Sequence, residues 1–200
     1  MGGIVIGCMN KVTLEGKLIR LEPLALAHVD SLAEVAFQPE LWTWYFTPPI
    51  TNRQELVALV ETALKGEANG TMLPFAIVER ATGRAIVSTR YLNVDLAHRR
   101  LEIGSTWIGA DWQRTAVNSE CKLLLLTHAF EQLKCVRVEF KTDSLNEKSR
   151  RAIERLGARE EGTLRSHFVT HTGRLRDTVY YSVLDSEWAT VKAGLQARRS

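Results

Sequence analysis

The chain has 200 residues, 45% hydrophobic and 24% charged, which is enough to bury one sizeable core. Its 26 basic and 23 acidic side chains give a formal net charge of +3, far from the clustered charge of a nucleic-acid-binding protein. The three cysteines, Cys8, Cys121 and Cys135, have neither disulfide nor metal-ligand spacing, which indicates a reducing compartment. No stretch approaches the roughly 20 apolar residues of a membrane-spanning helix.

Hydrophobic periodicity predicts a strand, two helices, three strands, a helix, a strand, a helix and two strands, followed by a final amphipathic helix. Their expected ranges are 17–21, 24–37, 53–65, 73–79, 84–93, 99–108, 120–133, 136–141, 146–156, 163–170, 175–184 and 186–199. Strands interleaved with helices in this way predict a mixed sheet with helices on both faces.

Residues 112–119 are expected to form a short polar loop between the strand at 99–108 and the central helix. A helix start leaves amide N–H groups unbonded and carries the positive end of the helix dipole, which favours a bound phosphate. Arg114 adds a permanently charged, bidentate donor. The pattern therefore predicts a site for a phosphate-bearing ligand.

The loop resembles the acyl-CoA pyrophosphate loop of the GNAT N-acetyltransferases, Gln/Arg-x-x-Gly-x-Gly/Ala. Here it reads Gln113-x-x-Ala116-x-Asn118, so the first position fits and the two glycine positions do not. Three further stretches are similar to the ribosomal-protein-alanine N-acetyltransferase (Rim-type) branch of that family: Leu101-Glu102-Ile103-Gly104, Asn146-x-x-Ser149 before Glu154-Arg155-Leu156-Gly157, and Gly173-x-x-x-Asp177-x-x-x-Tyr181 with Glu187-Trp188. The resemblance covers nearly the whole chain.

The resemblance implies a single GNAT-like α/β (α+β) domain at 14–188, with a disordered or artificial N-terminal segment at 1–13 and a C-terminal helical tail at 189–200. It implies a mixed central sheet of about seven strands with helices on both faces. The two central parallel strands, here 99–108 and 136–141, would splay apart in a V. Acetyl-CoA is then the cosubstrate in that cleft. No metal is expected, because the five histidines are scattered.

In such a cleft, the backbone near Trp107 and Ile108 pairs with the pantetheine arm of the cosubstrate. Asn146 also holds this arm, and Ser149 lies near the thiol. The residues that the resemblance assigns to the diphosphate are Gln113, Arg114, Thr115, Ala116, Val117, Asn118 and Ser119.

Three departures from the family pattern have physical consequences. Ala116 adds a Cβ where the backbone approaches phosphate, and Asn118 is tolerated because asparagine adopts left-handed conformations more readily than most residues. Many relatives place a tyrosine where this chain has Ile153. Ser149 or a water must then protonate the leaving thiolate, or no specific acid is required.

Glu102 is the candidate carboxylate that accepts the amine proton through a water, because the comparable glutamate of the family often faces the acetyl group. The alternative is an exposed or salt-bridged strand residue near Arg99 and Arg100. A peptide α-amine, with a pKa of about 8, is roughly a tenth neutral at pH 7, whereas a lysine amine near 10.4 is far less so. An α-amine therefore needs only a weak base.

Six residues are candidates for contact with the acceptor: Trp42, Trp44, Tyr45, Arg165, Asp177 and Tyr181. In the family, the loop between the first two helices walls the acceptor pocket, which is where the three aromatic residues lie. Core packing or an oligomer contact explains them equally well. The other three either orient a peptide or anchor the last hairpin, and the anchoring interpretation is favoured.

The leading hypothesis is an acetyl-CoA-dependent N-acetyltransferase that moves an acetyl group directly to a primary amine, such as the N-terminal amine of a ribosomal protein. Two alternatives stay open: an acetyltransferase for a small-molecule amine, and a non-catalytic acyl-CoA-binding module. The expected partners are acetyl-CoA and an amine acceptor, without a membrane or direct nucleic-acid contact. The expected location is the cytoplasm, and the sequence leaves a homodimer open.

Overall fold

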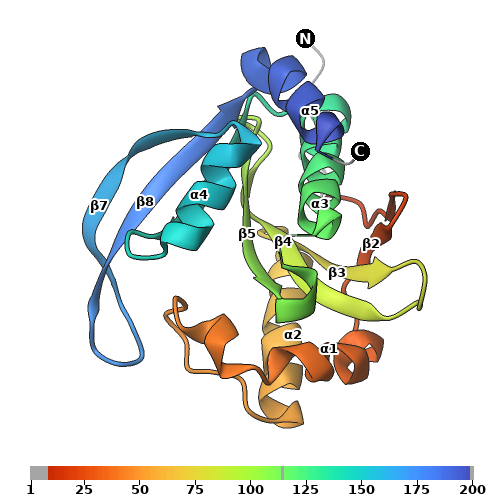
Figure 1. The fold of residues 1–200 in the computed structure, drawn as a ribbon, viewed down its shortest axis with the longest axis vertical. Helices are drawn as coiled ribbons and strands as arrows, with labels where there is room; N and C mark the ends of the chain where they lie inside the picture. The colour runs from red at the N-terminus through yellow and green to blue at the C-terminus, as the bar shows by residue number, and fades with distance from the viewer. Residues whose placement is uncertain (1–8, 114, 199–200) are drawn as a thin grey trace.

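The computed structural model describes residues 9–113 and 115–198 (Figure 1). Its strands are β1 (Leu14–Glu15), β2 (Ile19–Pro23), β3 (Leu73–Glu79), β4 (Ala85–Asp95), β5 (Arg100–Ile108), β6 (Arg137–Asp143), β7 (Arg159–Val169) and β8 (Leu175–Leu184). Its main helices are α1 (Val29–Ala36), α2 (Arg53–Ala68), α3 (Ala116–Thr127), α4 (Glu147–Leu156) and α5 (Trp188–Ala197). Apart from the short β1, the order of these helices and strands is the one predicted from the sequence.

All eight strands form one mixed sheet in the order β1-β2-β3-β4-β5-β6-β8-β7. Within the described residues, β5 and β6 are parallel and every other neighbouring pair is antiparallel. The predicted α/β fold with a mixed sheet is thus confirmed. The sheet has one strand more than expected, because the two-residue β1 pairs with β2.

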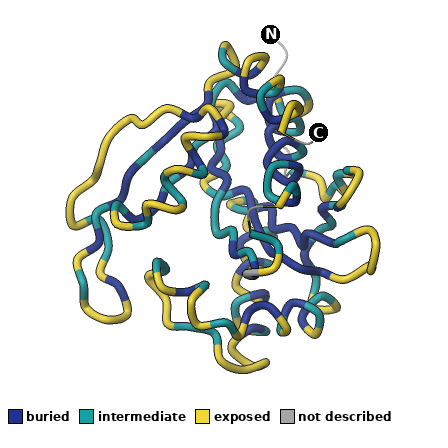
Figure 2. Tube along the Cα trace, in the orientation of Figure 1, coloured by how far each residue is buried: buried dark blue, intermediate teal, exposed yellow. Residues whose placement is uncertain are grey.

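Helices cover both faces of the sheet, and β3 shows why (Figures 1 and 2). Successive side chains of a strand point to opposite faces. Leu73, Phe75 and Ile77 belong to the core shared with α3, α4 and α5, whereas Ala76 and Val78 pack with α1 and α2. Burial on both faces explains the uninterrupted apolar run of this strand, which Figure 2 shows as a dark interior.

Side-chain caps define the starts of two helices. Asn52 Oδ1 accepts from the amide of Glu55 at the start of α2. Asn146 Oδ1 does the same for the amide of Ser149 at the start of α4. Helix α4 ends at Gly157, whose φ of +99° is the left-handed conformation that favours glycine.

The start of α3 corrects the sequence-based prediction of a loop over residues 112–119. The helix begins at Ala116, not near Glu120, with Thr115 as its N-cap, whose Oγ1 accepts from the amide of Val117. Residues 116–119 are therefore the first turn of the helix. Neither Ala116 nor Asn118 has a positive φ, so left-handed tolerance is not the reason for Asn118. Helical backbone needs no glycine at either position.

The final helix α5 packs against the same core as α3 and α4. Trp188, Val191 and Leu195 are buried within it, and the Trp188 indole Nε1 donates to Glu131 over 2.8 Å. Residues 188–197 are thus part of the folded core. Among the described residues, no helix has the combined length and apolarity needed to cross a membrane.

Glu120 joins the N-terminal strands to α3 from a fully buried position. Its carboxylate accepts from the amides of Lys17, Leu18 and Ile19 over 2.8, 2.7 and 3.1 Å. A Cβ on Gly16 would lie 2.8 Å from the Glu120 carboxyl carbon, so the turn requires glycine for this approach. One carboxylate therefore satisfies three main-chain donors that have no strand partner at that turn.

We expect Glu120→Gln to lower the free energy of unfolding by about 2–4 kcal/mol, because a neutral amide cannot accept from all three amides. Urea denaturation measures the change, with Glu61→Gln on the exposed face of α2 as the matched control. Equal stabilities of the two variants would show that Glu120 is not holding the turn.

Candidate active site

The two parallel strands β5 and β6 part soon after they begin. They pair at Arg100 with Arg137, at Leu101 with Val138 and at Glu102 with Glu139. Beyond Glu102, β5 continues to Ile108 and β6 to Asp143 without further pairing to each other.

A bulge in β5 accompanies this separation. The β4–β5 register shifts between Ser88 and Arg90, and Ser105 has a φ of +48°. The bulge bends β5 and increases its local twist. The result is the expected V-shaped cleft, with unpaired main-chain groups along its inner edges.

One mouth of the cleft lies between the starts of α3 and α4. Gln113 Nε2 donates to the carbonyl of Ile108 over 2.8 Å, and its Oε1 accepts from Lys148 on α4. Gln113 therefore links the end of β5 to α4 across the opening. Of the amides in the first turn of α3, those of Ala116 and Asn118 have no protein acceptor among the described residues.

The structure brings most of the predicted cofactor residues to this mouth. Thr115, Val117 and Ser119 share one helical turn with Ala116 and Asn118, while Arg114 lies outside the described residues. On the α4 side, Asn146 uses Oδ1 as the helix cap, and its Nδ2 has no partner in the described part of the chain. Ser149 lies in the first turn of α4 and is partly exposed.

Lys122 is a cleft residue to which the sequence analysis assigned no role. Its Nζ donates to Thr106 of β5 over 3.2 Å and lies 5.8 Å from the ring centroid of Phe140 of β6. No carboxylate lies within ion-pair distance in the described part of the chain, and burial lowers the pKa of this amine. The sequence does contain one sign of this role, because Lys122 lies within the apolar face of its helix. A buried cation without a counter-ion favours an anionic ligand nearby.

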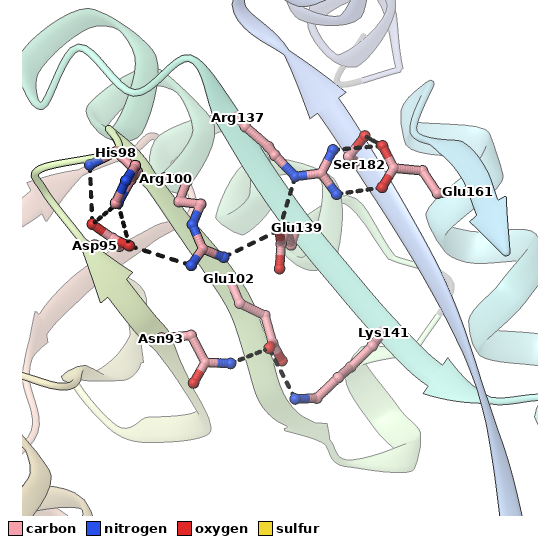
Figure 3. A network of polar contacts seen from close by, with 10 residues as sticks. All are labelled: Asn93, Asp95, His98, Arg100, Glu102, Arg137, Glu139, Lys141, Glu161 and Ser182. Carbon is pink, nitrogen blue, oxygen red and sulfur yellow. Dashed lines mark hydrogen bonds and ion pairs between the residues drawn. The ribbon is translucent and has the colours of Figure 1, made fainter. Parts of the chain in front are cut away.

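Glu102 lies on the opposite face of the sheet and is 1% exposed (Figure 3). Its Oε2 accepts from Asn93 Nδ2 over 2.8 Å and forms an ion pair with Lys141 Nζ at 2.9 Å. Its Oε1 accepts no hydrogen bond from the described residues. A Cβ on Gly104 would lie 2.8 Å from Oε1, so glycine there leaves room for the carboxylate.

The partner of Glu102 differs from the sequence-based alternative. Arg99 donates to the carbonyl of Lys134, and Arg100 pairs with Asp95 and Glu139. Lys141 reaches Glu102 because it lies two residues beyond Glu139, the parallel register partner of Glu102, and so faces the same side. Glu102 is salt-bridged but not exposed.

An ionic network joins the strands on this face before they part (Figure 3). Arg137 binds both Glu139 and Glu161, and Glu161 also accepts from Ser182 Oγ over 2.6 Å. The Arg137 hydrogen bonds lower the pKa of Glu161 to about 2. An open groove of roughly 700 Å³ lies over this network, with Asp95, Arg100, Glu139 and Tyr180 in its lining. The acids and bases of this surface are therefore paired with one another.

The aromatic segment between α1 and α2, residues 42–46, serves two purposes. Trp42 is fully buried, donates from Nε1 to the Ala36 carbonyl and packs 5.9 Å from Trp107, so it is a core residue. The carbonyl of Trp44 accepts from Arg176 of β8 over 3.2 Å. Phe46 stacks on Phe168 of β7 with ring centroids 5.2 Å apart. The segment thus bridges to the β7–β8 hairpin.

The remaining predicted acceptor residues lie on or behind this hairpin. Asp177 accepts from the amide of Ser166 over 2.7 Å, and Arg165 is exposed. The buried Tyr181 hydroxyl accepts from Arg150 and donates to Glu154 of α4. These contacts favour the anchoring interpretation for Asp177 and Tyr181.

Cys121 of α3 is a core residue and not a reactive thiol. It is 1% exposed, and burial raises its pKa to about 11. In the part of the chain that the structure describes, no cluster of three or more His, Cys, Asp or Glu side chains is arranged to hold a metal ion.

Comparisons with known proteins give a consistent result. The family described as Acetyltransferase (GNAT) domain matches residues 19–159. A structure described as a GCN5-related N-acetyltransferase from Brucella melitensis is 33% identical, with a TM-score of 0.89, and the match covers 97% of this chain and 88% of that one.

Two further matches carry more specific names. The Bacillus subtilis (strain 168) protein named "Putative ribosomal N-acetyltransferase YdaF" is 38% identical over 96 residues, 48% of this chain and 51% of that protein. This chain thus spans about half the length of that relative. Mycobacterium smegmatis RimJ, solved in complex with CoA-disulfide, is 21% identical with a TM-score of 0.78, covering 90% of this chain and 88% of that one. At that identity the likeness is one of fold.

We expect Lys141→Met to lower the free energy of unfolding by about 3 kcal/mol or more, because it leaves the Glu102 carboxylate buried without its counter-ion. The double variant Glu102→Gln/Lys141→Met should regain most of that loss. A double-mutant cycle in urea measures the coupling between the two side chains. Purely additive losses would mean that the ion pair contributes nothing beyond its separate members.

Proposed function

Because this chain belongs to the GNAT acetyltransferase family, we propose that it transfers the acetyl group of acetyl-CoA directly to a primary amine. The observation that carries the proposal is the cleft, where the β5–β6 ladder stops after Glu102 and Glu139. Open main-chain edges on both strands can pair with an extended, amide-bearing ligand as a further strand would. The pantetheine arm of CoA is such a ligand.

The start of α3 suits the CoA diphosphate. The amides of Ala116 and Asn118, which have no acceptor among the described residues, favour an anion at this mouth together with the helix dipole. Lys122 adds an amine deeper in the cleft that forms no ion pair within the described part of the chain. On the α4 side, Asn146 Nδ2 is available to the pantetheine arm, with Ser149 one helical turn away. RimJ, which has the same fold, was solved in complex with CoA-disulfide, and this supports a CoA compound as the ligand.

The chemistry requires a neutral amine and a proton acceptor near it. Glu102 Oε1 is the free oxygen of a carboxylate held in place by Asn93 and Lys141. We assign it to orient a water that takes the amine proton. Ser149 or a water returns a proton to the thiolate, because Ile153 is buried and has no acidic group. Acetyl-CoA supplies the activated acetyl group as its thioester.

If the protein is an enzyme, the amine that it acetylates is either a protein N-terminus or a small molecule. The name of the Bacillus subtilis relative, a putative ribosomal N-acetyltransferase, supports a ribosomal acceptor. A non-catalytic acyl-CoA-binding module is the contrasting function, and the Glu102–Lys141 ion pair together with Ile153 favours it. Binding of acetyl-CoA without transfer to any amine would identify that module.

We expect Asn118→Asp to change stability and cofactor affinity in opposite directions. A carboxylate in the first turn of α3 should stabilise the helix by about 0.5 kcal/mol through its dipole. The same charge should weaken acetyl-CoA binding by about tenfold or more through repulsion of the diphosphate. Calorimetry and thermal unfolding measure the two effects.

The matched control is Gln54→Asp in the first turn of α2, which should gain stability without losing affinity. Unchanged acetyl-CoA affinity in Asn118→Asp would place the diphosphate elsewhere.

We expect Glu102→Gln to lower kcat/KM by about 10²-fold or more while leaving acetyl-CoA affinity unchanged, because the amide cannot accept the proton. Release of free CoA reports turnover across a panel of peptides and small amines. The pH profile of kcat/KM is compared with that of the parent. Superimposable profiles would remove Glu102 from the proton-transfer role.

A further inference from the structure

Buried polar atoms without hydrogen-bond partners gather on one face of the sheet. In the part of the chain that the structure describes, they include Ser88 Oγ, Arg90 Nε, Trp107 Nε1, His167 Nδ1, Arg176 Nε and Thr178 Oγ1. They come from β4, β5, β7 and β8, far apart in the sequence. Native proteins seldom leave such atoms unpaired, so a cluster of them needs an explanation.

Contacts through the aromatic segment 42–46 hold these residues near one another. Ser88 pairs with Trp107 across the β4–β5 ladder, and Arg90 follows on the same face of β4. Trp107 packs on Trp42, whose ring lies 5.1 Å from Tyr45.

The β7–β8 hairpin reaches the same segment from the other side. Arg176 donates to the carbonyl of Trp44, and its guanidinium lies 6.0 Å from the Phe46 ring and 5.7 Å from the Phe168 ring. Thr178 follows Arg176 on the same face of β8, and the His167 ring lies 4.2 Å from that of Phe168.

The unpaired atoms are mainly donors, and the surplus charge is positive. Arginine Nε and tryptophan Nε1 can only donate. Arg90 is 6% exposed and has neither an ion pair nor a hydrogen bond among the described residues. Arg176, also 6% exposed, has one carboxylate near it, Asp143 at 3.8 Å, which Arg174 binds as well. The guanidiniums of Arg174 and Arg176 thus share the Asp143 carboxylate, and Arg90 has no carboxylate partner among the described residues.

The titration behaviour of nearby groups agrees with this geometry. Burial lowers the pKa of both Arg90 and Arg176. Burial also raises the pKa of Tyr45, and the positive charges of the same two arginines oppose that rise. Both guanidiniums therefore lie within electrostatic reach of the one hydroxyl.

The cluster lies beside the proposed reaction centre. Across the β4–β5 ladder, Arg90 pairs with Gly104 and Leu92 pairs with Glu102. Arg176 also interacts electrostatically with Glu102. A group bound by the two arginines would thus be close to an amine whose proton passes toward Glu102.

We propose that Arg90 and Arg176 bind an oxyanion of the acceptor, so that the substrate is an amine carrying a carboxylate or phosphate close to the nitrogen that is acetylated. Guanidinium groups match either oxyanion with paired, charge-assisted hydrogen bonds. Trp107 Nε1 and the hydroxyls of Ser88 and Thr178 complete the donor set. This inference rests on the proposed acetyl transfer and specifies its substrate class.

The test uses matched amines that differ only in the anion, with the full-length protein and acetyl-CoA. The pairs are amino acids with their carboxamides, aminoalkyl phosphates with the amino alcohols, and acidic with neutral N-terminal peptides. The parent should prefer the anionic member of one pair by roughly 10²-fold in kcat/KM. The pair that shows the preference identifies carboxylate or phosphate, and a small molecule or a peptide.

Arg90→Gln should abolish most of this preference, mainly by raising KM for the anionic member. Its Tm without ligand should rise, because an unpaired buried charge is removed. The control is Arg53→Gln at the exposed start of α2. If Arg90→Gln does not fold, Arg90→Lys keeps the charge, loses the fork geometry, and should lose part of the preference.

Equal use of anionic and neutral amines by the parent, or equal loss for both in Arg90→Gln, would overturn the proposal. If acetyl-CoA binds but no amine is acetylated, the proposed acetyl transfer is refuted, and the oxyanion site needs a separate test. Calorimetry with N-acetylamino acids and their amides in the presence of CoA then tests the pocket separately. No difference between those two probes would refute the oxyanion site as well.

Discussion

The separation of β5 and β6 is the constraint on which the rest of the structure depends. Parallel pairing holds these strands together through Glu102 and Glu139, and the buried Glu102–Lys141 ion pair joins them at that last rung. Gly104 leaves space for the carboxylate, and the bulge at Ser105 bends β5 away from β6. Before this point a network of paired charges ties the strands to their neighbours. Beyond it the main-chain groups of the two strands are open to a ligand and do not pair with each other. The helices and loops are arranged around that opening.

The two sides of the opening differ in chemistry. On the side of α3 and α4, helix amides without an acceptor among the described residues and the Lys122 amine favour an extended anionic ligand. On the other side, buried guanidiniums and indole donors lie under the aromatic segment. Direct transfer requires two substrates that meet at one point without displacing each other. A cleft open to both faces of a sheet, with Glu102 at its apex, meets that requirement because each substrate can enter from its own side.

Substitution of both motif glycines is compatible with this arrangement for a simple reason. The diphosphate loop was expected to run to residue 119, with Asn118 in a left-handed conformation. Thr115 instead caps the helix, so Ala116 and Asn118 have ordinary helical conformations. The amides that would face an anion belong to the helix terminus, and their direction follows from the helix axis, not from the side chains at those positions.

From the sequence by itself, the order of strands and helices after β1 and the two-faced sheet were predictable, because hydrophobic periodicity depends on residues a few positions apart. The start of α3 was missed because an N-cap threonine next to a polar turn reads equally well as a loop. Only the tertiary structure decided that Lys141 pairs with Glu102, that Trp42 is a core residue, and that Arg90 and Arg176 share one unpaired cluster. Those contacts depend on strand register and on the aromatic segment reaching a hairpin far along the chain, and no local pattern encodes either.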